Sequence, residues 1–290
     1  MKTCVIFNPA AKGQKAERLR ARLDIISQHA VLKQTAAAGD ARRLAAEAIA
    51  AGCDTVIAAG GDGTVNEVLN GIGDADAFHR VRLGVLPLGT VNVFARELGI
   101  PRDVRRAWDL ILRGRYTRID LGRAEFTANG VPQRRYFMQL GGVGLDARAV
   151  ELVDGRQKKR VGPLAYVVAG WKALRERQPR VTVTAGEQWA LGELALVGNG
   201  KFYGGCIRIQ DGASFRDGLL DVCVFPRVKR FSAWAAVFRE LPEKSVRRLR
   251  AAEFTIGAVP PAGFELDGEF VGQTPVTFRV EQEKLRVIVP

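Results

Sequence analysis

With 290 residues, the chain is longer than one ordinary hydrophobic core supports, so two domains are expected. Hydrophobic residues make up 47% and charged residues 26%, which excludes a disordered or fibrous protein. The formal net charge of +13 favours an anionic partner, either nucleotide phosphates, an acidic membrane surface or nucleic acid. Nucleic acid is set aside as a partner, because no zinc-finger or RNA-recognition signature is present.

No apolar run approaches the roughly 20 residues that a membrane-spanning helix needs, and the longest extends from Pro163 to Trp171. The first residues, MKTCVIFNPAAKG, lack the apolar core of a signal peptide. We therefore expect a cytoplasmic protein. The four cysteines show no metal-ligand spacing, and His29 and His79 are expected to be structural or solvated.

The first half alternates strand-like and helix-like segments. Its helix over 16–29 has Leu19, Leu23 and Ile26 on one face, and Asp40 is placed to cap the next helix. This alternation predicts parallel strands joined by crossover helices, a doubly wound α/β sheet. Strands are expected over 2–7, 31–35, 55–59 and 82–86, and helices over 16–29, 40–51 and 104–112.

From Tyr116 onward, short β-type runs separated by glycine, proline and polar turns dominate. They predict a β-sandwich-like second domain, interrupted by helices at 164–175 and 231–241. The expected fold class is therefore α/β plus β. We place the α/β domain at 1–122 and the β-rich domain at 123–283, with a return of the final strand near 284–290 to the first domain left open.

The sharpest local pattern is AAGGDGTVNEVLNG, from Ala58 to Gly71, between a buried strand and a helix. Glycines at 60, 61 and 63 let the backbone approach a phosphate, so that main-chain N–H groups and the helix N-terminus solvate its charge. Thr64 is placed to cap the helix or donate its hydroxyl, and Asp62 lies where a metal needs a carboxylate. A plain βα turn with an N-cap is the simpler alternative, but the length of the pattern favours function.

Two further turns follow strands of the same sheet, NPAAKG from Asn8 and PLGTVN from Pro87. The carboxyl ends of parallel strands share one edge of a sheet, where ligands bind. Neither a Walker A sequence nor GxGxxG is present, so an ordinary P-loop or dinucleotide site is not indicated.

With NPAAKG, GGDGTVNEVLNG, PLGTVNVFAREL, DG followed by LLDV, and ELDGE, the chain resembles the diacylglycerol kinase catalytic family, which includes bacterial lipid kinases and sphingosine kinases. The matching segments run from Asn8 to Glu269 in the family's order. The resemblance implies an ATP-binding α/β domain followed by a β-sandwich lipid-substrate domain, with the active site in the cleft between them.

By position, the resemblance also implies the residues of the nucleotide site. Glu67 and Asn92 are expected to support the loops. Val93 stands where many relatives have aspartate, so we assign it no role. The expected nucleotide contacts are Asn8, Gly61, Asp62, Gly63, Thr64 and Thr90.

Phosphoryl transfer usually uses a carboxylate that receives the proton of the acceptor hydroxyl. Asp267 and Glu269 suit this role, because i, i+2 spacing would place both on one face of a strand. Without context, a solvated Asp-Gly turn with a flanking charge is the better interpretation. The resemblance favours Asp267 as general base and Glu269 as the residue that orients it.

A second acidic segment is SFRDGLLD, residues 214–221. Relatives hold Mg²⁺ there, and the corresponding ligands are Ser214, Asp217 and the main-chain carbonyl of Leu219; such hard oxygen ligands suit Mg²⁺. Ser214 is a weaker ligand than a carboxylate. Asp120 matches a family carboxylate linked to this metal, although a strand-end aspartate is nearly as good an interpretation.

The expected function is an Mg²⁺- and ATP-dependent kinase that phosphorylates a lipid hydroxyl, with glycerolipids such as diacylglycerol favoured over sphingoid bases. An NAD kinase shares GGDGT, but the ELDGE and DGLLD segments argue against it. A non-catalytic nucleotide or lipid sensor would need no Asp267.

Residues 140–146 and 163–171 could line an acyl groove or equally form core. Basic clusters at 156–160 and 247–250 suggest peripheral docking on an anionic membrane surface. A homodimer is left open.

Overall fold

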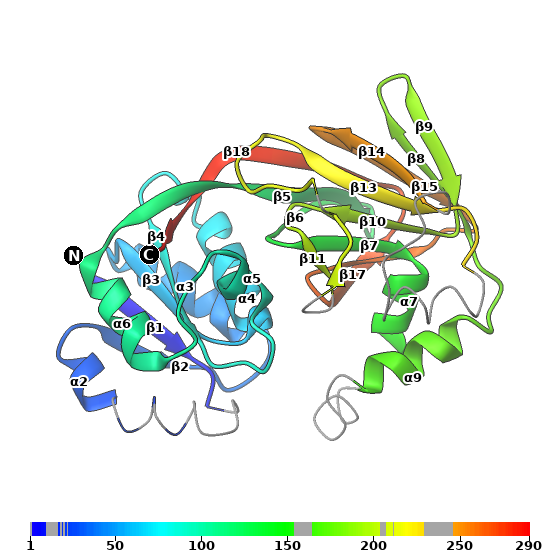
Figure 1. The fold of residues 1–290 in the computed structure, drawn as a ribbon. Coiled ribbons are helices and arrows are strands. Elements are labelled where there is room, and N and C mark those ends of the chain that lie inside the picture. The colour runs from blue at the N-terminus through cyan, green and yellow to red at the C-terminus, as the bar shows by residue number, and fades with distance from the viewer. Residues whose placement is uncertain are drawn as a thin grey trace. The chain divides into compact units, whose positions relative to one another are not determined.

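Figure 1 shows the fold, in which the chain forms two compact units described here from a computed structural model. The α/β unit consists of Met1–Leu121 and Glu281–Pro290, and the β unit consists of Gly122–Val280. The structure describes residues 2–9, 17, 19, 21, 23–153, 164–203, 207–210, 212–228 and 246–290, the side chains of 23, 24 and 164–167 excepted.

The α/β unit is built on a parallel sheet with the strand order β2-β1-β3-β4-β18. Its interior strands are buried along their length, because a parallel sheet is covered on both faces. The end of the last strand lies beside β4, where Arg286 pairs with Arg82 and Val287 with Leu83. The strands are β1 (Thr3–Phe7), β2 (Val31–Gln34), β3 (Thr55–Gly60), β4 (Arg82–Pro87) and β18 (Val276–Ile288).

Helices alternate with these strands in sequence, as the pattern predicted. Leu19 and Ile26 are both buried, in agreement with their expected shared face. Gly71 allows α3 and α4 to pack closely, since a Cβ there would lie 2.3 Å from the carbonyl oxygen of Arg42. The helices described in this unit are α2 (Leu23–Ser27), α3 (Asp40–Ala50), α4 (Asp62–Asp74), α5 (Val93–Glu97) and α6 (Val104–Arg113).

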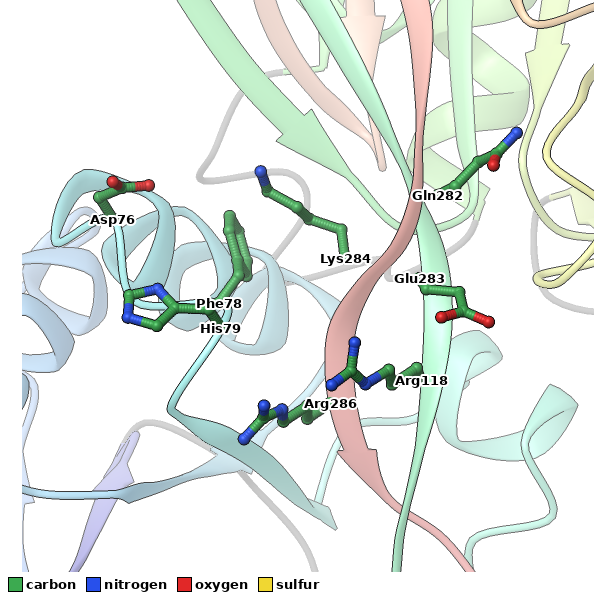
Figure 2. A pocket seen from close by; sticks show the side chains of 8 residues that line it. All are labelled: Asp76, Phe78, His79, Arg118, Gln282, Glu283, Lys284 and Arg286. Carbon is green, nitrogen blue, oxygen red and sulfur yellow. The ribbon is translucent and has the colours of Figure 1, made fainter.

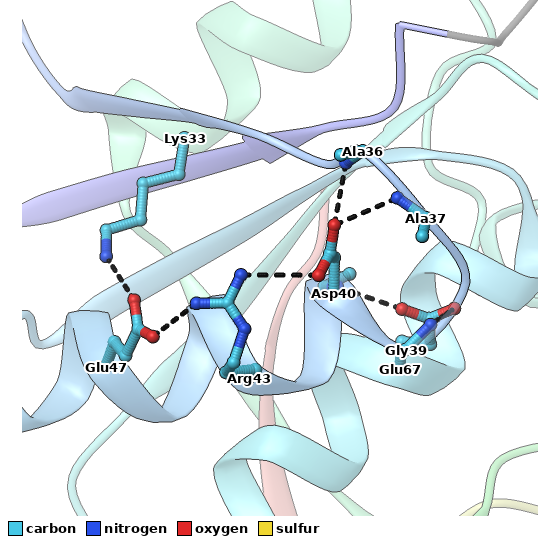
Figure 3. A network of polar contacts seen from close by, with 9 residues as sticks. Lys33, Ala36, Ala37, Gly39, Asp40, Arg43, Glu47 and Glu67 are labelled. Carbon is cyan, nitrogen blue, oxygen red and sulfur yellow. Dashed lines mark hydrogen bonds and ion pairs between the residues drawn. The ribbon is translucent and has the colours of Figure 1, made fainter.

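The start of α3 corrects the expected role of Asp40. The N-cap position is Gly39, in the left-handed region with φ of 87°. The Asp40 carboxylate instead accepts the N–H groups of Ala36 and Ala37, at 2.7 and 2.9 Å, in the preceding turn (Figure 3). An aspartate inside the first turn cannot cap its own helix, because the side chain that caps comes from the residue before it.

The β unit contains two antiparallel sheets. The first has the order β14-β13-β10-β7-β16-β17, and the second joins β18, β15, β8 and β9 with the hairpin of β5 and β6. Their strands are β5 (Tyr116–Ala128), β6 (Val131–Phe137), β7 (Leu140–Gly144), β8 (Arg180–Ala185), β9 (Gln188–Gly192), β10 (Leu194–Gly198), β13 (Leu220–Phe225), β14 (Arg247–Ala251), β15 (Glu253–Val259), β16 (Gly263–Leu266) and β17 (Glu269–Gln273).

Two smaller groups of elements are also described in the β unit. Helices α7 (Leu145–Leu152) and α9 (Leu164–Ala173) pack against each other. The short strands β11 (Phe202–Tyr203) and β12 (Ile207–Arg208) form a separate hairpin. The helix expected over 231–241 lies outside the described residues.

The hydrophobic core of the β unit lies between its two sheets. It takes Val143 and Val222 from the first sheet and Val183 and Phe254 from the second. Phe264 joins the two, because its ring meets that of Phe278 at 6.3 Å in an edge-to-face arrangement. The predicted class, an α/β domain followed by a β-sandwich-like domain, is confirmed.

In the described part of the chain, no helix combines the length and hydrophobicity needed to cross a membrane. Cys4, Cys53 and Cys223 are buried free thiols, and burial raises the pKa of Cys4 and of Cys223 to about 11. These thiols therefore behave as small hydrophobic side chains.

Candidate functional site

The first glycine loop joins β3 to α4 with almost no intervening residues. β3 ends at Gly60 and α4 begins at Asp62, so Gly61 is the N-cap and supplies no capping side chain. Gly60 cannot carry a side chain, because a Cβ there would lie 2.3 Å from the Thr64 hydroxyl oxygen. No side-chain cap covers the first N–H groups of α4, which suits them to an anion.

The second glycine loop follows β4 and is closed by an asparagine. Asn92 adopts a left-handed conformation with φ of 54° and is buried. Its Oδ1 accepts the N–H of Gly89 at 2.9 Å, and its Nδ2 donates to the Gly89 carbonyl at 2.6 Å. Asn92 therefore fixes this turn through both atoms of its amide group.

The two loops touch through their glycines. A Cβ on Gly89 would lie 2.6 Å from the Cα of Gly61, so no other residue fits at position 89 without displacing the first loop. The Leu88 N–H also donates to the Gly60 carbonyl at 2.9 Å. Loops that are 28 positions apart in sequence thus form one surface at the carboxyl ends of β3 and β4.

Asp62 ties this surface together from its position at the start of α4. Its carboxylate accepts the N–H groups of Val93 and Phe94, at 3.1 and 3.3 Å, in the first turn of α5. Burial raises the pKa of the Asp62 carboxyl, while these N–H donors act in the opposite direction. Asp62 therefore holds the first loop against the second. The sequence did not predict this contact between Asp62 and the start of α5.

Two other predicted nucleotide residues, Asn8 and Thr90, lie in the turns that follow β1 and β4. Asn8 follows β1, and its N–H donates to the Ala59 carbonyl of β3 at 3.2 Å, which brings the first turn to the same sheet edge. Thr90 is exposed in the second loop. Residues 10–13 of the first turn lie outside the described residues.

Glu67 has a different structural role from the loop residues. Its two carboxylate oxygens accept the N–H groups of Gly39 and Ala41, both at 2.9 Å, so it caps α3 from the side of α4 (Figure 3). This position supports the helix layer of the α/β unit. Its predicted support of the loops is therefore indirect, through the packing of α3 against α4.

In the β unit, Asp267 and Gly268 form the two-residue turn between β16 and β17. Both have positive φ, 49° and 86°, which is the conformation of a type I′ turn. The expectation that Asp267 and Glu269 share one strand face is therefore wrong. Asp267 lies in the turn itself, and Glu269 begins the next strand opposite Leu266.

The Asp267 carboxylate is held by three main-chain donors. Its Oδ2 accepts the N–H of Met138 at 2.8 Å, and its Oδ1 accepts those of Gln139 and Leu140 at 2.9 and 3.1 Å. These bonds fix the orientation of the carboxylate against the start of β7. The Glu269 side chain is 37% exposed, and its carboxylate pairs with Arg135 at 3.7 Å.

The predicted metal ligands lie in the turn before β13. One Asp217 oxygen accepts the Leu219 N–H at 3.1 Å, and the other pairs with Arg250. The Ser214 hydroxyl accepts the Arg216 N–H at 3.3 Å. Within the described ranges, no group of three or more histidine, cysteine, aspartate or glutamate side chains is placed to hold a metal.

Asp120 belongs to the α/β unit and is almost fully buried. One of its oxygens accepts the N–H of Glu283 at 2.8 Å, so it joins β5 to β18. This contact is a structural one, although Asp120 lies inside β5 and not at the end of a strand. Its link to a metal stays a prediction.

A buried acidic pair was not predicted from the sequence. Asp146 at the start of α7 and Glu265 on β16 share a hydrogen bond, and the Tyr203 hydroxyl donates to Asp146. Gly142 makes room for them, because a Cβ there would lie 2.1 Å from an Asp146 oxygen. The sequence carried no usable signal, since alternation along the strand puts Glu265 on the face opposite the core residues Phe264 and Leu266, and that face is covered by α7.

Burial sets the charge state of this pair. It raises the pKa of the Asp146 carboxyl, and it raises that of Glu265 well above the usual range, with the neighbouring Asp146 charge adding to the effect. The Glu265 oxygen Oε2 also accepts the Gly268 N–H at 2.6 Å. Burial therefore disfavours the ionised forms of these two carboxyl groups, which lie beside the turn that carries Asp267.

A pocket of about 180 Å³ lies elsewhere in the α/β unit (Figure 2). It is lined by Phe78 and His79, which follow the end of α4, and by basic residues such as Arg118, Lys284 and Arg286. Lys284 lies 5.8 Å from the centre of the Phe78 ring. Because α4 is roughly 20 Å long, this pocket is separate from the glycine loops at its other end.

Comparison with known proteins gives a match for each half of the chain. The diacylglycerol kinase catalytic domain matches residues 2–124, and the YegS C-terminal NAD kinase beta sandwich-like domain matches residues 141–289. The combination defines a phosphotransferase with an alcohol group as acceptor. The chain belongs to the diacylglycerol kinase family, and its general activity is that of a lipid kinase.

Relatives match over nearly the whole chain. A diacylglycerol kinase of Bacillus subtilis (strain 168) is 32% identical over 265 residues, covering 88% of this chain and 84% of the relative. One from Staphylococcus saprophyticus is 28% identical over 298 residues, covering 99% and 94%. The solved structure of a candidate diacylglycerol kinase from Bacillus anthracis strain Sterne is 25% identical, with a TM-score of 0.79 over 100% of this chain and 97% of that chain.

Proposed function

We propose that this enzyme transfers the γ-phosphoryl group of ATP to the hydroxyl of a glycerolipid of the diacylglycerol class. The paired glycine loops carry the proposal, because Gly89 lies so close to Gly61 that a Cβ on Gly89 would be 2.6 Å from the Gly61 Cα, beside the N-terminus of α4 that no side chain caps. Relatives named diacylglycerol kinase support the choice of acceptor. Mg²⁺ enters with ATP, as part of the substrate.

The α/β unit would hold the nucleotide by its backbone. Phosphates at the N-terminus of α4 would meet the uncapped N–H groups after Gly61, where the helix dipole favours negative charge. Asp62 would act by keeping the second loop in register through Val93 and Phe94. Phosphoryl transfer depends mainly on positioning and electrostatics, so a rigid pair of loops supplies most of what the donor needs.

The β unit would act on the acceptor. Asp267 would accept the proton of the lipid hydroxyl, with its carboxylate held in one orientation by the N–H groups of Met138, Gln139 and Leu140. Fixed orientation favours general-base catalysis, since the base need not reorganise at the moment of transfer. Glu269, paired with Arg135, would orient the acceptor beside it.

The test is transfer from labelled ATP in the presence of Mg²⁺. The panel contains diacylglycerol, monoacylglycerol, sphingosine and NAD, each presented separately, with lipids in mixed micelles. We expect label in phosphatidic acid and none in NADP. Label in NADP would establish an NAD kinase, label in sphingosine phosphate alone would establish a sphingoid-base kinase, and the absence of any transfer would support a sensor.

Membrane docking is a second part of the proposal. The net charge of +13 favours an anionic surface, and α9 exposes Val168 and Trp171 beside Lys172. The cluster at 247–250 contributes less than expected, because Arg248 and Arg250 are engaged in contacts within the β unit. The cluster at 156–160 lies outside the described residues.

Binding to vesicles tests this docking. With phosphatidylcholine vesicles containing increasing phosphatidylglycerol, we expect binding to rise with anionic content and to fall as salt is added, since the attraction is screened. A Trp171→Ala variant should bind more weakly at every composition. Binding that ignores salt would contradict the electrostatic part of the proposal.

A further inference from the structure

A single arginine holds the turn from Gly212 to Asp221 in the β unit. Arg250 on β14 is the direct cross-strand partner of Asp221 on β13. Its Nε donates to an Asp221 oxygen at 3.3 Å, and its Nη2 donates to the Gly212 carbonyl at 3.2 Å. The same Nη2 pairs with Asp217. One guanidinium therefore meets two carboxylates and a main-chain carbonyl of one turn.

Two of the three ligands expected for a metal, the side chains of Asp217 and Ser214, already make contacts within the protein. Asp217 uses one oxygen for Arg250 and the other for the Leu219 N–H. Ser214 contributes a hydroxyl, a weak ligand, and that hydroxyl accepts a main-chain N–H. The residues of this turn, as they are arranged here, do not fit a divalent cation.

Charge leads to the same conclusion. A guanidinium stays protonated at any physiological pH, and it presents several donors in a fixed plane. A Mg²⁺ ion at Asp217 would therefore lie beside a permanent positive charge. The two carboxylates and one arginine leave a net charge of −1, which is little attraction for a hydrated divalent ion that loses water reluctantly.

The neighbouring arginine on the same strand makes a contact of the same kind. Arg248 lies two positions before Arg250, so both side chains leave the same face of β14. Its Nη1 donates to the Ile209 carbonyl at 2.8 Å. The two arginines thus bind the main-chain carbonyls of Ile209 and Gly212. Both contacts hold this segment against β14.

We propose that the Arg250 guanidinium is the resident cation of this turn and that the turn folds without a divalent metal. The guanidinium balances Asp217 and Asp221 and binds the Gly212 carbonyl, the three tasks that a structural metal would perform. This inference does not depend on the phosphate donor or the lipid that the enzyme uses.

The first test compares thermal unfolding of the full chain with and without Mg²⁺, after treatment with EDTA and without nucleotide. It is run on the wild type and on Asp217→Asn, so that binding of Mg²⁺ elsewhere cancels. We expect the same Mg²⁺-induced shift in Tm for both proteins, and that shift can be zero. A rise in the wild type that Asp217→Asn removes would overturn the proposal.

The second test removes the guanidinium. Arg250→Met should lower Tm by roughly 2 to 6 °C, because two carboxylates and a carbonyl lose their donor. Arg247→Met, on the same strand opposite Val224, is the matched control and should leave Tm nearly unchanged. Arg250→Lys should recover part of the loss. An Arg250→Met protein as stable as the control would overturn the proposal.

Discussion

Asp62 in the α/β unit and Asp267 in the β unit use their carboxylates in the same way, but they fix different structures. Asp62 accepts two N–H groups from a helix start, and Asp267 accepts three from the beginning of a strand. The first joins two glycine loops of a parallel sheet. The second joins a hairpin turn to a neighbouring strand. Acidic residues in both family motifs therefore position main chain.

Glu67 and Glu265 extend the comparison to charge. Glu67 accepts two main-chain N–H groups and caps a helix as a carboxylate. Glu265 is buried against Asp146, and the two share a hydrogen bond. The α/β unit thus uses Glu67 to order the start of a helix, whereas burial in the β unit raises the pKa values of an acidic pair.

The largest expected effect is that of Asp267→Asn. We expect kcat to fall by roughly 10² to 10⁴, the range for a positioned acid or base. Tm should fall as well, since an amide nitrogen cannot accept the third N–H, a loss of about 1–3 kcal/mol. Glu269→Gln is the matched control and should keep the wild-type Tm. A folded Asp267→Asn enzyme with wild-type kcat would show that the carboxylate is purely structural.

The next largest effect is expected for Asp62→Asn. Losing one acceptor should loosen the second loop and lower kcat/KM for ATP by about 10² to 10³, as for other preorganised electrostatic sites. Asp74→Asn, at the opposite end of α4 and paired with Arg42, is the control and should behave like wild type. Steady-state kinetics over a range of ATP concentrations gives both values. Equal losses in the two variants would mean that only helix stability had changed.

A smaller effect is expected for Gly89→Ala, which tests the contact between the loops. The added methyl would lie 2.6 Å from the Gly61 Cα, so we expect a loss of about 1–3 kcal/mol in the free energy of unfolding and weaker ATP binding. In the control, Gly257→Ala, the methyl meets no atom within 4 Å. Urea unfolding and nucleotide titration provide the measurements, and an unchanged ATP affinity would separate loop packing from binding.

The smallest effect is expected for Glu265→Gln and appears in the pH dependence of stability. The folded-state pKa of Glu265 is raised, so the wild type loses stability as pH rises above about 4.5, until the folded carboxyl ionises. Glutamine does not titrate, so the variant should lose less stability over that window. The groups facing Glu265 are Asp146 and, through it, Tyr203, with Asp267 nearby.

Urea unfolding at several pH values measures this difference. Glu253→Gln is the control, because Glu253 is exposed and pairs with Arg279 at 3.0 Å. Parallel pH profiles for the wild type and Glu265→Gln would contradict a raised pKa of Glu265.

Periodicity predicted the strands and helices of the α/β unit, because buried parallel strands and amphipathic helices write their burial into neighbouring residues. The last of the short β-type runs expected after Tyr116 belong to one long strand, β18, from Val276 to Ile288. Glycine spacing identified both loops. The contact of Asp62 with Val93 could not be read from local sequence, since it joins residues 31 positions apart.

The β unit was harder to predict in detail. The Asp-Gly pair at 267 and 268 is a strong signal of a two-residue hairpin turn. Such a turn places Asp267 in the turn and Glu269 at the start of the next strand, as observed. The pairing of Arg250 with Asp217 and Asp221 depends on the register of β13 and β14. Register is a tertiary property, so local sequence could not show that Arg250 lies beside the predicted metal ligand Asp217.

In the proposed function, the α/β unit holds the nucleotide and the β unit acts on the acceptor. Nucleotide Kd and single-turnover phosphoryl transfer, measured on Asp62→Asn and Asp267→Asn side by side, test it most directly. We expect Asp62→Asn to weaken nucleotide binding, and Asp267→Asn to bind ATP as the wild type does while transfer at saturating ATP slows by roughly 10² or more. Weakened ATP binding by Asp267→Asn with an unchanged transfer step would contradict the account.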